Sequence, residues 1–204
     1  MRDNPRGAKA PRIGRAFHLT HLHCVHQVLS RASVVSQHIP IDPESFQGRA
    51  NLLRWSKEQS KLRIPNARVL FALGLGAGLS AIEIAGVCAS HVSIANGEGV
   101  VAVSGERPRQ LSLSSPWAAL LRTGLTSRKP DDWAFCPIRK GAGTNLVSNF
   151  VARAPSIEIK PNTQRMRATW IVERLSTGHP AIELMRDAGV QSLEALTRYV
   201  QFVS

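Results

Sequence analysis

The feature that most constrains the fold is a change of period near the middle of the chain. Residues 91–113, "HVSIANGEGVVAVSGERPRQLSL", alternate apolar and polar side chains in three short segments. Asn96-Gly97 and the stretch "GERP" at 105–108 mark turns between these segments. The stretches before and after follow the helical period instead. This order predicts a mainly α-helical α+β domain with one small three-stranded antiparallel sheet.

Helical patterns flank the predicted sheet on both sides. Before it they cover about 43–61, 67–76 and 80–87, and after it about 115–123, 144–153, 163–176, 180–187 and 192–203. The stretch "GLGAG" at 74–78 follows no strand and precedes no Gly-Lys-Ser/Thr. We therefore expect close helix packing there and not a nucleotide-binding loop.

The residues before the predicted domain, which covers 43–204, divide into two parts. Residues 1–16 carry five Arg or Lys and two prolines, which predicts a disordered basic arm that either lies along nucleic acid or is a solvated tail. Residues 17–42 are predicted to form one amphipathic helix followed by a linker. The helix carries a group of possible metal ligands: His18, His21, His23, Cys24 and His26. Their spacing matches no compact zinc signature, so we expect a polar or packing face and no metal.

The composition favours a polyanionic partner. The 204-residue chain has 26 Lys plus Arg against 14 Asp plus Glu, a formal charge of +12, and is 43% hydrophobic. It is too apolar for a disordered chain and basic enough to suggest nucleic acid. Cys24, Cys88 and Cys136 are widely spaced and odd in number, so we expect a reducing cytoplasm and no disulfide framework. The longest apolar run, 69–89, is interrupted by four glycines, and no signal-peptide core follows the basic start.

Four stretches of the predicted domain resemble motifs of the tyrosine recombinase, or phage integrase, family: "ALGLGAGLSAIEIAGVCASHV" at 72–92, "VVAVSGERPRQLSL" at 100–113, "NTQRMRATWIVERL" at 162–175 and "MRDAGVQSLEALTRYVQFV" at 185–203. The resemblance covers about residues 43–203 and implies the fold of the family's catalytic domain. In that family a tyrosine attacks a DNA phosphate, which two arginines, a lysine, and histidine or tryptophan residues hold in place.

The resemblance places Tyr199, the chain's only tyrosine, on the nucleophile and Arg167 on the second arginine. Residues of other types stand at the remaining positions: Ser80 at the first arginine, Glu106 at the turn lysine, and Gln164 and Val190 at the two histidines. A shift of one residue in the short turn would instead place Arg107 at the lysine. Losing one phosphate contact costs about 10² to 10³ in rate. We therefore predict no strand cleavage and a vestigial site.

The two retained residues also have purely structural interpretations. Tyr199 is then a half-buried aromatic on the last helix, where Leu196, Val200 and Val203 form the packing face. Arg167 either contacts a phosphate or pairs with an acidic neighbour. For a vestigial site we favour the packing role of Tyr199.

Several cations at predicted turns and helix starts are expected to contact DNA phosphates, although each is also compatible with an ordinary solvated side chain: Arg107, Arg109, Arg139, Lys140, Lys160, Arg165 and Arg167. We predict a non-catalytic, cofactor-free protein that binds double-stranded DNA and regulates transcription or recombination of a phage or mobile element at the nucleoid. Two alternatives remain: an active recombinase with a rearranged site, and an interaction module that binds a recombinase. A homodimer is a further expected partner arrangement.

Overall fold

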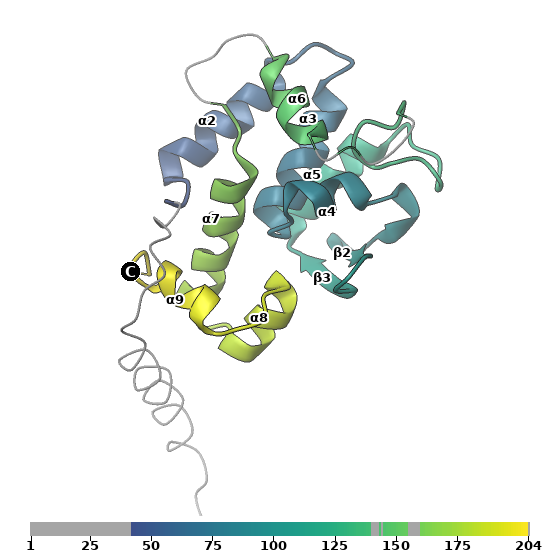
Figure 1. Cartoon of the computed structure of the whole chain (residues 1–204). Helices are drawn as coiled ribbons and strands as arrows, with labels where there is room; N and C mark the ends of the chain where they lie inside the picture. The colour runs from purple at the N-terminus through teal and green to yellow at the C-terminus, as the bar shows by residue number, and fades with distance from the viewer. Residues whose placement is uncertain (1–41, 140–142, 144, 155–159, 204) are drawn as a thin grey trace, which may run out of the picture. The chain divides into compact units, whose positions relative to one another are not determined.

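The computed structural model describes residues 42–139, 143, 145–154 and 160–203, and the fold below is the fold of those residues. The predicted basic arm, the N-terminal helix with its histidines, and Lys140 lie outside them. Figure 1 shows the described domain with its helices and strands labelled.

Between residue 42 and the sheet lie three helices: α2 (Phe46–Lys57), α3 (Ile64–Phe71) and α4 (Ala81–Gly86). The first is shorter than predicted, because Ser45 caps its start by accepting a hydrogen bond from the N–H of Gly48 at 3.0 Å. α3 continues directly into a π-helical turn, Ala72–Gly76. The predicted helices therefore exist, with ends that differ by a few residues.

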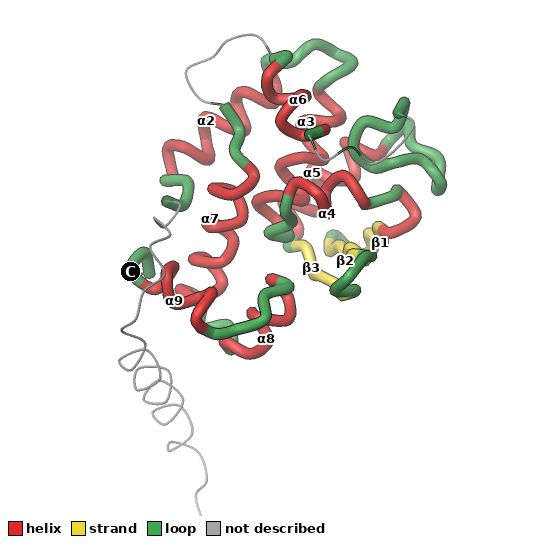
Figure 2. The backbone as a smooth tube through the Cα atoms, viewed as in Figure 1, coloured by secondary structure: helices red, strands yellow, loops and turns green. Residues whose placement is uncertain are grey.

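The three-stranded sheet is confirmed. A 3₁₀ turn, Ala89–His91, leads into β1 (Val92–Ala95), β2 (Glu98–Val103) and β3 (Arg109–Leu113), which pair in the order β1-β2-β3 with both pairs antiparallel (Figure 2). The first turn has positive φ angles at both central residues, 51° at Asn96 and 85° at Gly97. This is the backbone that an Asn-Gly hairpin signal predicts.

Five helices follow the sheet: α5 (Ser115–Leu125), α6 (Leu146–Ala152), α7 (Thr163–Ser176), α8 (Ala181–Ala188) and α9 (Glu194–Val200). α7 starts where predicted, because the side chain of Asn162 accepts the N–H groups of Gln164 and Arg165 at 2.9 and 3.2 Å. Among the described residues, no helix has the length and apolar character that crossing a membrane requires.

The glycine-rich stretch packs tightly, as expected from its sequence. A Cβ atom added at Gly74 would lie 3.0 Å from Met166 of α7, and one at Gly76 would lie 2.7 Å from Trp117 of α5. The π-helical turn is fully buried against both helices. Small residues here let three segments approach closely, and this region is the centre of the main core, whose largest buried side chains include Trp55, Phe71 and Phe135.

A second, smaller group of buried side chains joins α7 to the last two helices. We call it the C-terminal cluster: Ala168, Trp170, Ile171, Leu184, Ala188, Leu196 and Tyr199. α8 and α9 lie across one end of α7, and α8 also contacts β3 (Figure 1). The fold thereby brings Arg107 and Arg109, α7 and α8 to one region, and α9 packs against α7.

Candidate functional site

The start of α4 carries Ser80, which the sequence resemblance aligns with the family's first arginine. Ser80 is the N-cap of this helix, and its N–H and its hydroxyl each donate a hydrogen bond to Oε2 of Glu83 at 2.8 Å. The N–H of Glu83 donates back to the Ser80 hydroxyl at 3.4 Å. This is a reciprocal capping box. Ser80 therefore has a structural role and brings no positive charge to the site.

Two guanidinium groups flank the carboxylate of Glu83. Nη2 of Arg109, from β3, lies 2.7 Å from Oε1, and Nη1 of Arg167, from α7, lies 3.6 Å from Oε2. Burial alone would raise the pKa of Glu83, but the Ser80 N–H and the Arg109 guanidinium lower it further than burial raises it. The carboxylate is therefore ionised at neutral pH and holds both arginines.

Arginines also hold the carboxyl end of α8. Nε of Arg109 donates a hydrogen bond to the carbonyl oxygen of Asp187 at 2.7 Å. Nη2 of Arg167 donates to the next carbonyl oxygen, that of Ala188. Nη1 of Arg107 donates to the one after it, that of Gly189. Carbonyls at this end lack helical partners and carry the negative end of the helix dipole. We call Arg107, Arg109 and Arg167 the arginine clamp.

The clamp leaves few donors free. Nη1 of Arg167 donates to the carbonyl of Gly78 at 2.6 Å, in addition to its contact with Glu83. Nη1 of Arg109 donates to the carbonyl of Arg107 at 3.2 Å, so all three nitrogens of the Arg109 side chain have acceptors or an ion-pair partner. The side chains of Arg109 and Arg167 are 5% and 19% exposed. Of the two interpretations of Arg167, the structure thus contains the pair with an acidic neighbour.

Tyr199 is buried on α9, with 5% of its surface exposed, and belongs to the C-terminal cluster. Val190, at the position of the family's late histidine, packs against that cluster. Burial lowers the pKa of Arg167, while the charge of Glu83 acts in the opposite direction. The expected packing face was wrong in part: Leu196 is buried, but Val200 and Val203 are exposed.

The two other substituted positions, Glu106 and Gln164, carry exposed side chains. Glu106 lies in the turn before β3, next to Arg107. Thus Ser80, Arg167, Val190 and Tyr199 gather around one region through Glu83 and the C-terminal cluster. Among the described residues, no three His, Cys, Asp or Glu side chains gather as metal ligands would.

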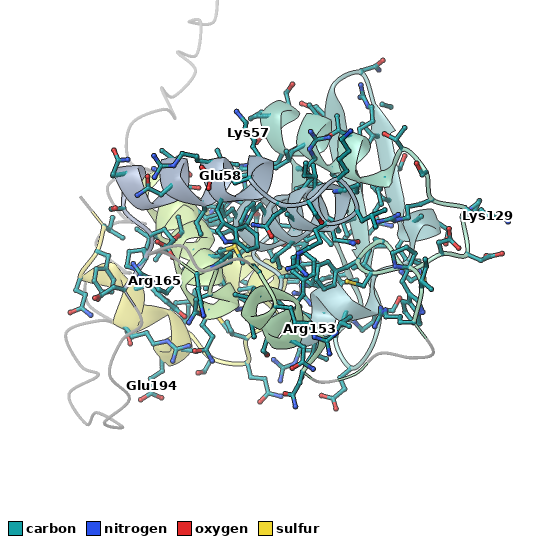
Figure 3. All side chains as sticks on the ribbon, turned by 90° about the horizontal axis from the view of Figure 1, so that it is seen from above. Lys57, Glu58, Lys129, Arg153, Arg165 and Glu194 are labelled. Carbon is teal, nitrogen blue, oxygen red and sulfur yellow. The ribbon has the colours of Figure 1, made fainter. Side chains whose placement is uncertain are left out.

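The predicted phosphate contacts fall into two groups. The side chain of Arg109 is 5% exposed; its Nε and Nη1 donate hydrogen bonds and its Nη2 pairs with Glu83, while its contact with a phosphate stays a prediction. Arg139 is half-buried, donates to the Ala85 carbonyl and stacks over the Trp133 ring at 4.2 Å. Lys160 and Arg165 are exposed. Arg165, which is labelled in Figure 3, pairs with Glu44 at 3.3 Å.

Sequence reasoning missed the role of Arg109 as the second partner of Glu83. It also missed the clamp. The carbonyl groups that Arg109 and Arg107 bind lie 78 and 82 residues away along the chain. Backbone acceptors leave no trace in side-chain identity. The only available signal was the Arg-x-Arg pattern at 107 and 109 beside a predicted strand.

No protein-family model matches the chain, and no curated protein matches it. Several solved structures are similar to it. XerH site-specific recombinase, in a post-cleavage complex with a palindromic difH substrate, matches 82% of this chain and 51% of its own at a TM-score of 0.63 and 18% identity. XerA recombinase matches 82% of this chain and 60% of its own, with a TM-score of 0.60 and 16% sequence identity. The Tn1549 transposon integrase in complex with circular intermediate DNA matches 81% of this chain and 64% of its own, with a TM-score of 0.55 and 13% sequence identity.

The chain therefore spans 51% to 64% of the length of these three proteins. At 13% to 18% identity, what the comparison shows is the fold. In the described residues, the predominance of helices and the three-stranded antiparallel sheet agree with it. The described domain has the fold of the tyrosine recombinase catalytic domains.

Proposed function

We propose that this protein binds double-stranded DNA through its recombinase-like domain without cleaving it, as a regulator of transcription or recombination for a phage or another mobile element, associated with the nucleoid. The net charge of +12 supports a polyanionic partner. Two of the similar structures, those of XerH and the Tn1549 integrase, are complexes with DNA. Fold similarity is an analogy, so the residues of this chain carry the argument.

The main support for the proposal that the protein does not cleave DNA is the capping role of Ser80. Its hydroxyl and N–H are both bonded to Glu83, which supports our assignment of Ser80 as an uncharged cap in place of the family's first phosphate-binding arginine. Glu106 is acidic and exposed, and Val190 is apolar, so neither can donate a hydrogen bond from its side chain to a phosphoryl oxygen at neutral pH. A phenol without such donors is a poor nucleophile.

One observation favours the alternative of an active recombinase with a rearranged site. Arg109 brings a second guanidinium to Glu83, beside the position where the family's arginine is missing. Its 5% exposure and its bonded nitrogens argue against a catalytic role, because a catalytic arginine must present donors to the phosphate. The non-catalytic proposal is therefore the better supported of the two.

The DNA-binding part depends on exposed cations near α7. Lys160 and Arg165 flank the start of this helix, and the side chain of Arg107 is exposed on the turn before β3. Cations of this kind give affinity for any sequence, with a steep dependence on salt. Arg165 would exchange its partner Glu44 for a phosphate.

Titrating a duplex with the protein at several salt concentrations tests this proposal. We expect binding that weakens linearly in a double-logarithmic plot, and a slope that falls by about one for each contact removed in Lys160→Gln and Arg165→Gln. Arg122→Gln is the matched control, because Arg122 is exposed on α5 and forms no clamp contact. Absence of binding at about 50 mM salt, where phosphate contacts are least screened, would favour the interaction-module alternative.

A further inference from the structure

Glu44 is a buried acidic residue that pairs with one of the predicted DNA contacts. It lies directly before Ser45, the N-cap of α2, and its side chain is 3% exposed. Nε of Arg165, in the first turn of α7, lies 3.3 Å from Oε1 of Glu44, and the Arg165 side chain is 45% exposed. The pair therefore joins a buried anion to a cation that solvent reaches.

Other contacts keep Glu44 in its place. Its N–H donates a hydrogen bond to Oγ1 of Thr169 at 2.7 Å, and that hydroxyl donates to the carbonyl oxygen of Arg165 at 2.9 Å. On α2, a Cβ atom added at Gly48 would lie 2.8 Å from Oε2 of Glu44. None of these contacts involves the guanidinium of Arg165, so Glu44 stays buried when that guanidinium turns away.

The charge of Arg165 favours the ionised form of Glu44. Burial raises the pKa of Glu44 above its ordinary value of 4.5, and the Arg165 guanidinium lowers it in part. Two further charged side chains of these helices, Arg49 of α2 and Glu173 of α7, pair with each other, and Asp42 is exposed. Removal of the Arg165 guanidinium therefore raises the pKa of Glu44 further.

A DNA phosphate competes with Glu44 for the same guanidinium. Carboxylates and phosphates both accept charge-assisted hydrogen bonds from arginine, and Arg165 is exposed enough to meet a duplex. When a phosphate takes Arg165, the carboxylate of Glu44 keeps its burial and loses its counter-charge. A buried carboxylate without a partner is costly, so it takes up a proton from water.

We propose that Glu44 and Arg165 form a proton-linked latch: Glu44 holds Arg165 in the free protein, and DNA takes Arg165 while Glu44 takes up a proton. The latch rests on the proposed DNA binding, because the competing anion is a duplex phosphate. The complex then carries more protons than the free protein. Affinity for DNA therefore rises as the pH falls toward the ordinary range of glutamate, and this gain is lost as the pH rises.

Duplex binding by the full chain, measured at fixed salt from about pH 8 to about pH 5.5, tests the latch. The affinity of the wild type should rise several-fold more over this range than that of Glu44→Gln. At the upper end Glu44→Gln should bind about three- to tenfold more tightly than the wild type, since Arg165 is released. Glu58→Gln removes a negative charge from a largely exposed pair at the end of α2 and should keep the wild-type pH dependence.

Arg165→Gln should weaken binding and, like Glu44→Gln, abolish the extra proton uptake. Calorimetry in two buffers of different ionisation enthalpy measures this uptake. Protonation of histidines is common to all these proteins and cancels in the comparison. Circular dichroism and the melting temperature verify folding, and Arg165→Gln carries the comparison if Glu44→Gln does not fold.

Two outcomes separate the latch from the DNA binding on which it rests. Equal proton uptake by the wild type and the folded variants, with DNA binding intact, would overturn the latch alone. Absence of DNA binding by the wild type and by Glu44→Gln across the whole pH range would overturn the proposed function, and the latch with it.

Discussion

The main core and the carboxyl end of α8 are held together by different physics. In the main core, glycines at 74 and 76 let α5, α7 and the π-helical turn approach until side-chain volume fills the space. At the end of α8, three guanidinium groups bond backbone carbonyls and one carboxylate, beside a small apolar cluster. Packing of the first kind is specific and hard to open. Polar attachment of the second kind responds to charge, pH and competing anions.

Truncation in the main core is expected to give the largest loss of stability. Phe71 is fully buried and meets the Trp55 ring edge-on at a centroid distance of 5.7 Å. Phe71→Ala should lower the free energy of unfolding by about 3–5 kcal/mol, since it removes apolar burial and leaves a cavity. Chemical denaturation measures the effect, and Val100→Ala, at an exposed site of β2, is the control, with a change within about 0.5 kcal/mol.

Neutralising Glu83 is expected to give a smaller loss that depends on pH. Glu83→Gln leaves the guanidinium groups of Arg109 and Arg167 without their counter-charge, at a site 22% exposed, and should cost about 1–3 kcal/mol at pH 7. The folded pKa of Glu83 lies below its ordinary value of 4.5, so its contribution is present above that value and is lost as the pH falls through the folded pKa.

The wild-type and Glu83→Gln stabilities should therefore converge below about pH 4, as the ordinary pKa of Glu implies. Glu58→Gln is the matched control, because Glu58 forms a largely exposed pair with Arg54 at 3.8 Å. A gap between wild type and Glu83→Gln that stays constant down to pH 3 would show that the ionised carboxylate does not hold the arginines.

Gly189→Ala should give the smallest of these losses. Its φ of 63° is left-handed, a region that favours glycine, and a Cβ atom would crowd Arg109 at 3.1 Å. We expect a cost of about 1 kcal/mol with faster hydrogen exchange confined to α8 and α9. Gly178→Ala, which also has a positive φ of 75° but open space around the added atom, separates backbone strain from crowding of the clamp. Equal local exchange in both variants would count against a role for the clamp.

The sequence predicted the fold well because the fold depends on local patterns. The Asn96-Gly97 hairpin, the Asn162 cap and the glycine-rich packing all follow from short-range preferences and volume. It predicted the site less well. The pair between Arg109 and Glu83 was not predicted, and Val200 and Val203 were assigned to the packing face of α9 but are exposed. Both depend on where distant segments dock, and a backbone carbonyl that accepts an arginine has no sequence signal.

The same comparison explains why Tyr199 alone says little about activity. Its position on the last helix follows from the fold, whereas a nucleophile requires donors around its target. Ser80 is a helix cap, and Arg109 and Arg167 hold carbonyls and Glu83. The position of Tyr199 therefore reflects the recombinase-like fold, whereas the proposed loss of cleavage depends on Ser80, Arg109 and Arg167.

The most direct test of binding without cleavage uses one labelled, nicked duplex. If the protein cleaves this duplex, the short strand segment next to the nick dissociates, so the covalent intermediate cannot be religated and accumulates. The wild-type protein should shift this duplex in a native gel and leave no protein–DNA adduct after denaturation in detergent. Tyr199→Phe should behave in the same way in both gels. A detergent-resistant adduct with the wild type that is lost in Tyr199→Phe would contradict the account and establish Tyr199 as a nucleophile.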